Sequence, residues 1–222
     1  TLGGSSSING MVYIRGHALD FDSWQEMGCE GWSYNDVLPY FIKMENYAGG
    51  DDNVRGVNGP VNVRRPIPSD VISRAFLKAG EESGYLMTND INGDLQEGFG
   101  VFDSTIHKGK RWSTARAYLD SVKTNANLTI LTETLVEDIK IINKKATGVN
   151  VKDKNGKIGF ISAEKEVILS AGAVGTPHIM MLSGLGPKEH LQDNGISVIN
   201  DLPGVGSNLN DHPDFVLKYK CI

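Results

Sequence analysis

Glycine is the residue that most constrains how this chain can fold. It occupies 26 of the 222 positions, about 12% of the chain against a usual share of about 7%. No three-residue repeat accompanies it and proline is limited to 8 residues, which excludes a collagen-like or low-complexity chain. Because 40% of the residues are hydrophobic, a sizeable core can form. We therefore expect the glycines in loops where the backbone closely approaches a ligand or another element.

Charge and cysteine content exclude several classes of partner and site. The net charge is −5 and no basic stripe is visible, which argues against a nucleic-acid partner. No apolar run reaches the roughly 18 residues of a membrane-spanning helix, and the start does not resemble a signal peptide. Cys29 and Cys221 lack a C-x-x-C partner, and the histidines lack H-E-x-x-H spacing. We expect two reduced thiols, no metal site and a cytoplasmic location.

The first residues suggest that the sequence belongs to a longer one. The chain starts without methionine, and residues 1–7 already form a glycine–serine cluster. Such loops normally follow a scaffold element. We therefore expect this sequence to be one part of a longer protein.

Two helices are predicted in the first half of the chain. Ser33 is expected to cap the first, with Asp36 completing a capping box, and Pro39 is expected to distort it. The second helix is expected to start at a Ser69 cap and to end at Gly84. Apolar residues recur at helical spacing in both, namely Val37, Leu38, Phe41 and Ile42 in the first and Val71, Ile72, Ala75, Phe76 and Ala79 in the second.

The second half changes to a strand pattern, so the predicted fold class is mixed α/β. Strands are expected at residues 128–131, 136–142, 147–152 and 166–170. Asn155 and Gly156 predict a two-residue hairpin turn with positive φ at both positions. After the last strand, Thr176 and Pro177 predict the N-cap and first residue of a helix. Residues 48–60 predict a long loop.

The segment 2–10, LGGSSSING, has the composition of a ligand-binding loop. Paired glycines let a backbone lie against a planar or anionic ligand, and successive N–H groups can form an anion nest. The serines add hydroxyl groups, and Asn9 adds a donor and an acceptor. A flexible glycine–serine linker is the alternative, and the residues alone leave both open.

Residues 166–186 predict a strand, a glycine turn and a helix start, where unpaired amides can bind the phosphate or ribose of a dinucleotide. The sequence contains no G-x-G-x-x-G, and the glycines could serve only tight strand–helix packing. Asp211 and His212 could act as an acid–base pair, but adjacent residues of an extended segment point oppositely, so a turn is favoured.

Arg111 to Thr114 could bind phosphate. An N-cap at Ser113, opening a helix over residues 114–120, is the favoured interpretation.

Taken together, these segments resemble the glucose–methanol–choline (GMC) flavin oxidoreductases over essentially all 222 residues. TLGGSSSINGMVYIRG at 1–16 is similar to the family's first signature without its opening residues, and GAVGTPHIMMLSGLG at 172–186 is similar to the second. DFDSW, GWSYNDVLPYF, RWSTA and LPGVGSNLNDH also match in order, although Asn210 stands where the family more often has glutamine. GSSSINGMVYIRGHALDFDSW, QEGFG and VLKYKC look closest to the choline dehydrogenase branch.

The resemblance implies an incomplete, Rossmann-like FAD-binding fold of mixed α/β class, with part of the substrate-binding domain. Residues 1–222 would be the central part of the N-terminal FAD-binding region. The family's first βαβ unit with G-x-G-x-x-G and its C-terminal catalytic domain are absent from the sequence.

FAD is the cofactor that the resemblance implies. The residues along the flavin and its phosphates would be Thr1, Gly4, Ser5, Asn9, Gly10, Met11 and Val12, and Val136 would meet the adenine through its backbone. Small residues permit close stacking, and amides can polarise the N1–C2=O side of the flavin. The catalytic histidine would lie beyond the C-terminus, so no catalytic residue is assigned and the chain alone is expected to be inactive.

The implied reaction is oxidation of a primary, choline-like alcohol to the aldehyde by hydride transfer to flavin N5. An alcohol or sugar oxidase, a hydroxynitrile lyase and a non-catalytic flavin-fold scaffold stay open as alternatives. The expected partner is a small-molecule alcohol, and the electron acceptor is left open. Membrane association, if any, would come through the full-length protein.

Overall fold

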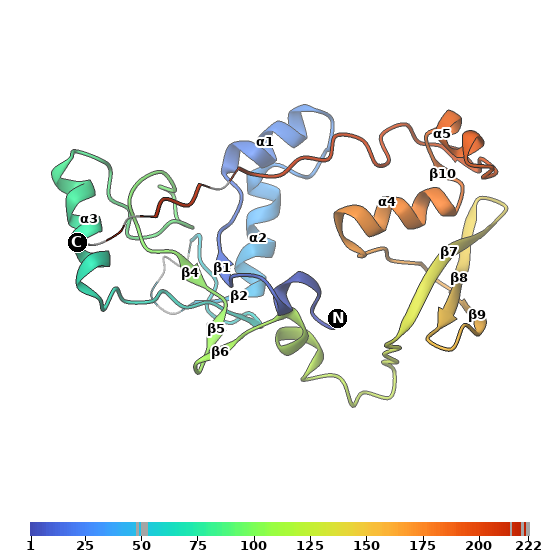
Figure 1. The fold of residues 1–222 in the computed structure, drawn as a ribbon, viewed down its shortest axis with the longest axis horizontal. Coiled ribbons are helices and arrows are strands. Elements are labelled where there is room, and N and C mark those ends of the chain that lie inside the picture. Colours follow the sequence, from blue (N-terminus) through green and yellow to red (C-terminus); the bar gives the residue numbers. More distant parts are fainter. Residues whose placement is uncertain (48, 50–52, 214, 219, 221–222) are drawn as a thin grey trace. The chain divides into compact units, whose positions relative to one another are not determined.

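The computed structural model describes residues 1–47, 49, 53–213, 215–218 and 220 (Figure 1). The chain divides into two compact units, Thr1–Ile130 and Leu131–Ile222. The expected loop at 48–60 lies partly outside the described residues, and its described residues, 49 and 53–60, form no helix and no strand longer than a single bridge. Cys29 is a free, exposed thiol, whereas Cys221 lies outside the described residues.

The first unit consists of helices joined by short paired strands. Its helices are η1 (Gly4–Ser7), α1 (Ala18–Glu26), α2 (Tyr34–Met44), α3 (Val71–Glu82) and η2 (Ala115–Leu119). Its strands are β1 (Val12–Tyr13), β2 (Glu45–Asn46), β3 (Val61–Asn62), β4 (Asp103–Ser104), β5 (Ile106–His107) and β6 (Lys110–Arg111). The pairs β1–β4 and β5–β6 are antiparallel, and β2–β3 is parallel.

The predicted cap of α2 is confirmed, while α1 went unpredicted. Ser33 Oγ accepts from Asp36 N at 3.3 Å, and Asp36 Oδ2 accepts from Ser33 N at 3.2 Å. Pro39 lies inside α2 without ending it. In α1 the cap is His17, whose Nδ1 accepts from Leu19 N at 3.2 Å. Histidine is not among the residues that favour this position, so the start of α1 carries no N-cap signal of the usual kind.

The cap of α3 was predicted one residue too early. Asp70, not Ser69, is the N-cap, and its Oδ1 accepts from Ser73 N at 2.7 Å. Both residue types cap helices well, so composition could not separate them. The predicted end is confirmed, because Gly84 follows the C-cap Ser83 with φ +80°.

A network of ion pairs is buried in the first unit. Arg55 lies at its centre, with a side chain that is 0% exposed. It donates to Glu45 at 2.7 to 3.1 Å, to Asp90 at 2.6 and 2.8 Å and to Asp103 at 3.0 Å. The Tyr47 ring lies against it, with its centroid 4.0 Å from the guanidinium carbon. Burial opposes its charge, but the hydrogen bond and charge of Glu45 and the other carboxylates raise the pKa of Arg55.

Two further arginines balance the charge of this network. Arg15 pairs with Glu45 at 2.6 Å, and Arg65 pairs with Asp103 at 2.9 Å. Three guanidinium groups thus face three carboxylates. We call this set the Arg55 cluster; its members are Arg15, Glu45, Arg55, Arg65, Asp90 and Asp103. A small apolar core adjoins it, made of Tyr13, Tyr47, Val61 and Val63.

We expect the unit to lose stability in acid through Asp90. Burial opposes ionisation of this carboxyl, but the hydrogen bond from Asn92 N and the charges of Arg55 and Arg65 outweigh it and lower its pKa. A lowered folded-state pKa gives stability that is present above the unfolded value of about 3.9 and is lost as the pH falls through the folded value. Urea unfolding at a series of pH values should therefore show a falling free energy of unfolding below about pH 4, with a smaller slope in Asp90→Asn. An unchanged slope in that variant would contradict the assignment.

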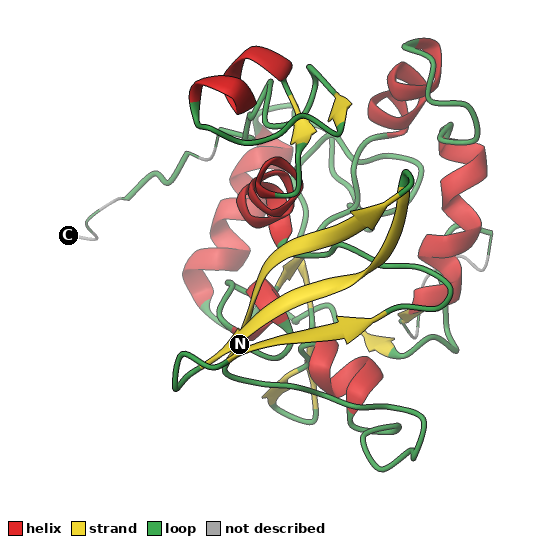
Figure 2. Ribbon diagram, turned by 90° about the vertical axis from the view of Figure 1, so that its right-hand side faces the viewer, coloured by secondary structure: helices red, strands yellow, loops and turns green. Residues whose placement is uncertain are grey.

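The second unit is built on a three-stranded antiparallel sheet that is followed by a helix (Figure 2). Its elements are β7 (Thr134–Ile142), β8 (Lys145–Asp153), β9 (Ile158–Ser162), α4 (Gly172–Leu182), β10 (Leu185–Gly186), α5 (Lys188–Asp193) and β11 (Asn200–Asp201). The helix α4 packs against β7. Ile139 N donates to Ser183 Oγ at 2.8 Å, which fastens the end of α4 to the sheet.

A two-residue hairpin turn is present, but it joins β7 to β8 and not β8 to β9, where it was predicted. Asn143 and Lys144, with φ 50° and 62°, join the paired residues Ile142 and Lys145. At the predicted place, residues 154–157 form a longer connection in which only Gly156 has a positive φ. The reason lies in Asp153, whose Oδ1 accepts from Asn155 N and Lys157 N at 2.8 and 2.9 Å and wraps the wider turn.

Two predicted strands are absent, and one helix starts earlier than predicted. Residues 128–131 and 166–170 have no ladder partner within the described part of the chain, and a strand exists only with one. The helix α4 starts at Gly172, not Thr176. Gly172 has φ +86° and turns the chain. The Thr176 hydroxyl accepts from Ala171 N at 3.1 Å from inside the helix.

Across the described ranges, no helix combines the length and the apolarity needed to cross a bilayer.

Candidate functional site

The glycine–serine segment of the first unit is a folded turn. Gly3 and Gly4 have φ 87° and 53°, conformations that other residues adopt at a cost. The turn of η1 continues with hydrogen bonds from Ile8 N and Asn9 N to Ser5 O, at 3.1 and 2.8 Å. A Cβ added at Gly4 would meet nothing within 4 Å, so this face is open. The flexible-linker alternative therefore does not hold.

A second segment, which contains Arg111 and Thr114, lies more than 100 positions later in the sequence and holds this turn through hydrogen bonds. Arg111 Nη1 donates to Ser6 O at 3.2 Å, to Asn9 O at 2.7 Å and to Asn9 Oδ1 at 2.8 Å. Thr114 Oγ1 donates to Gly3 O at 3.1 Å, and Thr114 N donates to Ser6 Oγ at 2.9 Å. Arg111 thus binds the loop itself. Its Nη1 is already used by the loop, which weakens the phosphate-binding alternative for this residue.

The predicted cap at Ser113 is wrong by one residue, because the N-cap of the helix is Thr114, which makes no side-chain capping hydrogen bond. Ser113 Oγ accepts from Arg116 N at 3.5 Å, a long contact, and Ser113 O accepts from Ala117 N at 2.9 Å. The helix that follows, η2, is a short π-helix and not an α-helix.

The loop ends in a strained residue that is held on both sides. Met11 has φ 64°, a left-handed conformation that is uncommon outside glycine. Its N donates to Asn9 Oδ1 at 3.0 Å, and its O accepts from Thr105 N at 2.8 Å. Val12 then enters β1 opposite Ser104. Backbone strain of this kind persists where surrounding structure fixes it, and it clusters at ligand-binding sites.

Seven of the predicted cofactor residues belong to this one loop. Most are exposed and Met11 is half-buried; they are Thr1, Gly4, Ser5, Asn9, Gly10, Met11 and Val12. Small side chains and an open face fit the approach of a large planar group. The eighth predicted residue, Val136, belongs to the second unit.

Val136 lines an apolar cavity of about 590 Å³ between β7 and α4. The lining residues are Leu135, Val136, Glu137, Asp138, Ala171, Gly175, His178, Ile179 and Leu182. Val136 pairs with Val151 and Asp138 with Asn150, so Glu137 is the extra residue of a β-bulge. A bulge leaves backbone groups unpaired. The cavity thus combines apolar walls with free backbone polar groups, which fits an aromatic base.

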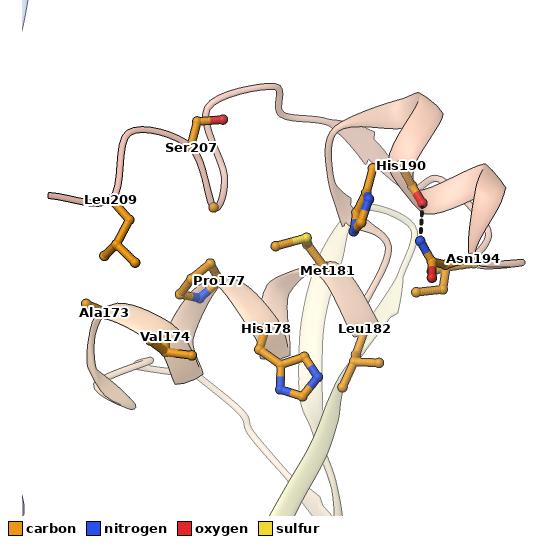
Figure 3. A pocket seen from close by; sticks show the side chains of 12 residues that line it. Ala173, Val174, Pro177, His178, Met181, Leu182, His190, Asn194, Ser207 and Leu209 are labelled. Atoms are coloured by element: carbon orange, nitrogen blue, oxygen red, sulfur yellow. Dashed lines mark hydrogen bonds between the residues drawn. The ribbon is translucent and has the colours of Figure 1, made fainter.

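Another cavity, of about 640 Å³, lies beside α4, α5 and the turn at Gly206 (Figure 3). The ring of His178 points away from Ser207 and Leu209. A Cβ at Gly206 would lie 2.7 Å from Met181 Cε, so this turn packs directly on α4.

The acid–base alternative for Asp211 finds no support. Asp211 Oδ1 accepts from the backbone N of its neighbour His212 at 2.8 Å, so the carboxylate binds the backbone and not the imidazole. Within the ranges that the structure describes, no three histidine, cysteine, aspartate or glutamate side chains are placed so that they could hold a metal ion.

An ordered glycine–serine loop with an open face, together with an apolar cavity edged by unpaired backbone, is typical of proteins that bind a nucleotide cofactor with a large ring. Residues 1–214 match the profile of one such family. The chain belongs to the GMC oxidoreductase family. Members of this family bind FAD.

Curated relatives match nearly the whole chain. The oxygen-dependent choline dehydrogenase of Rhizobium johnstonii is 49% identical over 214 residues, which are 96% of this chain and 39% of that protein. The oxygen-dependent choline dehydrogenase of Brucella anthropi is 46% identical over 220 residues, 99% of this chain and 40% of that protein. The chain thus spans about two fifths of the length of these relatives.

Solved structures confirm the expected mixed α/β FAD-binding fold, of which this chain forms a part. An FAD-dependent oxidoreductase from Chaetomium thermophilum aligns with a TM-score of 0.85 and 36% identity, covering 90% of this chain and 37% of its own. A formate oxidase from Aspergillus oryzae aligns with a TM-score of 0.81 and 30% identity, covering 90% and 36%.

Sequence reasoning missed the roles of Arg111, Glu137 and Ala171. The sequence suggests a phosphate contact for Arg111 and does not predict its contact with the loop. The strand pattern at 136–142 predicted β7 but not its bulge, because alternation does not reveal an extra residue. Ala171 precedes the second signature, and only the start of α4 at Gly172 places it at the cavity.

Proposed function

We propose that this chain is part of an FAD-dependent alcohol dehydrogenase that oxidises a primary, choline-like alcohol to the aldehyde. The observation that carries the proposal is 46–49% identity to oxygen-dependent choline dehydrogenases along nearly the whole chain. When bound, FAD supplies the acceptor for a hydride from the alcohol carbon.

In this proposal the loop of the first unit contacts the flavin and its phosphates. The contacting residues are Thr1, Gly4, Ser5, Asn9, Gly10, Met11 and Val12. Their small side chains let the backbone approach, and their amides can bind an anionic or electron-rich edge. The fastening by Arg111 and Thr114 means that the loop is ordered before the ligand arrives, which lowers the entropy cost of binding.

The cavity at Val136 takes the adenine in this proposal. Leu135, Ile179 and Leu182 offer apolar contact, and the unpaired backbone at Glu137 offers hydrogen bonds that fix the orientation of the base.

We assign no catalytic base to residues 1–222. His17 Nδ1 caps α1, and the His107 ring packs on Trp112 with centroids 4.9 Å apart. His178 and His190 line cavities of the second unit. We propose that the proton of the alcohol is taken by a group supplied by the full-length protein.

Cofactor binding tests the cavity assignment with a matched pair of variants. The full gene product is expected to purify with FAD. Ala171→Leu fills the cavity that contains Val136 and should weaken FAD binding by about tenfold or more, as expected when about 1.4 kcal/mol of binding energy is lost. Ala173→Leu, two positions further along the chain in α4 and lining the other cavity, should bind FAD as the wild type does. Equal loss in both variants would contradict the assignment.

Substrate profiling tests the activity. With a dye acceptor, the full gene product should oxidise choline faster than simple aliphatic or aryl alcohols. A preference for another alcohol would remove the choline-like assignment and leave the alcohol dehydrogenase. Bound FAD without any alcohol oxidation would favour the hydroxynitrile lyase, and a full gene product with neither FAD nor activity would favour the non-catalytic scaffold.

A further inference from the structure

The side-chain amide of Asn9 has only one orientation available to it. Its Oδ1 accepts from Met11 N at 3.0 Å and from Arg111 Nη1 at 2.8 Å. Neither donor can accept a hydrogen bond. A flipped amide would place its NH₂ group against both of them, so the oxygen is fixed toward the protein.

The nitrogen of this amide is left free. Within the described ranges, Asn9 Nδ2 makes no hydrogen bond to the protein, and Asn9 is exposed. An exposed amide nitrogen carries two N–H donors and no acceptor. The loop therefore offers a donor at this point of its surface.

Arg111 is the residue that enforces this orientation. Its Nη1 also donates to Ser6 O and Asn9 O, so a single group gathers three oxygens of the loop. Unlike the guanidinium groups of the Arg55 cluster, it forms no ion pair among the described residues. Its Nη1 group is thus committed to the loop and is not shared with a carboxylate.

We propose that Arg111 is a positioning residue that orients Asn9 so that the loop presents Nδ2 as a hydrogen-bond donor to an electron-rich carbonyl oxygen or ring nitrogen of the bound cofactor. This inference rests on the proposed FAD-binding function and adds to it the polarity of one contact. A donor at such an atom stabilises the ring more when it carries extra electrons. Asn9 therefore favours the reduced state of the ring.

The variant Asn9→Asp separates the two functions of the side chain. A carboxylate has nearly the same shape and still accepts from Met11 N and Arg111, so the loop stays fastened. It cannot donate, and it faces the ligand with a negative charge. In the full gene product we expect FAD binding to weaken by about tenfold, the usual effect of replacing a hydrogen bond by a repulsive contact, and the flavin midpoint potential to fall.

Arg111 is tested by loss and rescue. Arg111→Met keeps the length of the side chain but leaves Met11 N as the only donor to Asn9 Oδ1 among the described residues, so the amide is held less firmly and the flavin midpoint potential should fall in the same direction. Arg111→Lys keeps a donor and a charge and should restore most of the wild-type potential. Arg74→Met is the matched control, because Arg74 also donates to a backbone carbonyl, Ser69 O at 2.8 Å, away from the loop. Its potential and FAD affinity should not change.

The following outcomes would overturn the positioning proposal or the proposed function. Wild-type FAD affinity and potential in Asn9→Asp would overturn it, as would an unchanged potential in Arg111→Met. If the wild-type protein binds no FAD, the proposed function fails. The amide orientation is then tested by NMR of the protein without ligand, in which Arg111→Met should shift the Asn9 side-chain NH₂ signals and Arg74→Met should not. Unshifted signals in Arg111→Met would overturn the positioning role.

Discussion

Replacing Arg55 with methionine is expected to lower the free energy of unfolding by about 3–5 kcal/mol, the usual cost of leaving one buried charge uncompensated. Glu45 and Asp103 are 0% exposed at their side chains. Each would keep one arginine, Arg15 or Arg65, and the shared central charge would be gone. Methionine fills much of the volume but offers no donors.

Urea unfolding of the purified protein measures this loss, with two companion variants. Arg55→Lys keeps the charge but cannot form the forked contacts, so we expect an intermediate loss. Lys78→Met removes an exposed ion pair with Glu82, at 3.4 Å, and should cost less than about 1 kcal/mol. If Arg55→Met were as stable as Lys78→Met, the Arg55 cluster would contribute no more to the free energy of unfolding than an exposed ion pair does. Arg55→Lys keeps the comparison available if Arg55→Met fails to fold.

Gly148→Ala is expected to destabilise the second unit by about 3 kcal/mol, through overpacking and backbone strain. A Cβ at Gly148 would lie 2.2 Å from Ile161 O and 2.6 Å from the Phe160 ring. Gly148 pairs with Lys140 of β7 and with Ser162 of β9, so both neighbouring strands limit the relief that a shift can give.

The matched control for this change lies in the same sheet. At Gly159 an added Cβ would meet only Val151 Cγ2, at 3.6 Å, which is ordinary contact. Gly159→Ala should therefore change the free energy of unfolding by less than about 0.5 kcal/mol. Both values come from urea unfolding followed by circular dichroism. Similar losses in the two variants would show that the close approach at Gly148 is relieved at little cost.

Local signals predicted the local elements of the fold. The capping box of Ser33 and Asp36 identified α2, and alternation identified β7 and β8. The cap of α1 is a histidine, which carries no start signal. The run at 166–170 has the composition of a strand, but composition does not supply the neighbour that a ladder requires.

Long-range features of the fold could not be predicted from the sequence. Arg15, Glu45 and Arg55 have charged side chains, which are normally solvated. Nothing in their local sequence distinguishes them from surface residues, because their burial depends on partners as distant as Asp90 and Asp103.

In the candidate site, too, local features could be predicted from the sequence and long-range contacts could not. Glycine, serine and Asn9 predicted a ligand-binding loop, and the structure shows that this loop is ordered. The direction of the Asn9 amide depends on Arg111, 102 positions later, and no spacing rule connects the two. Val136 was placed on its strand, whereas the bulge beside it depends on the pairing with β8.

The span of the Arg55 cluster has a consequence for biosynthesis. Arg15, Glu45 and Arg55 leave the ribosome well before Asp90 and Asp103, and translation adds about 5–20 residues per second. During those seconds the early residues have no complete set of counter-charges, so the nascent segment stays hydrated and cannot settle into its final packing. The first unit can close only after the late carboxylates emerge, which makes its folding a step that follows synthesis of its last third.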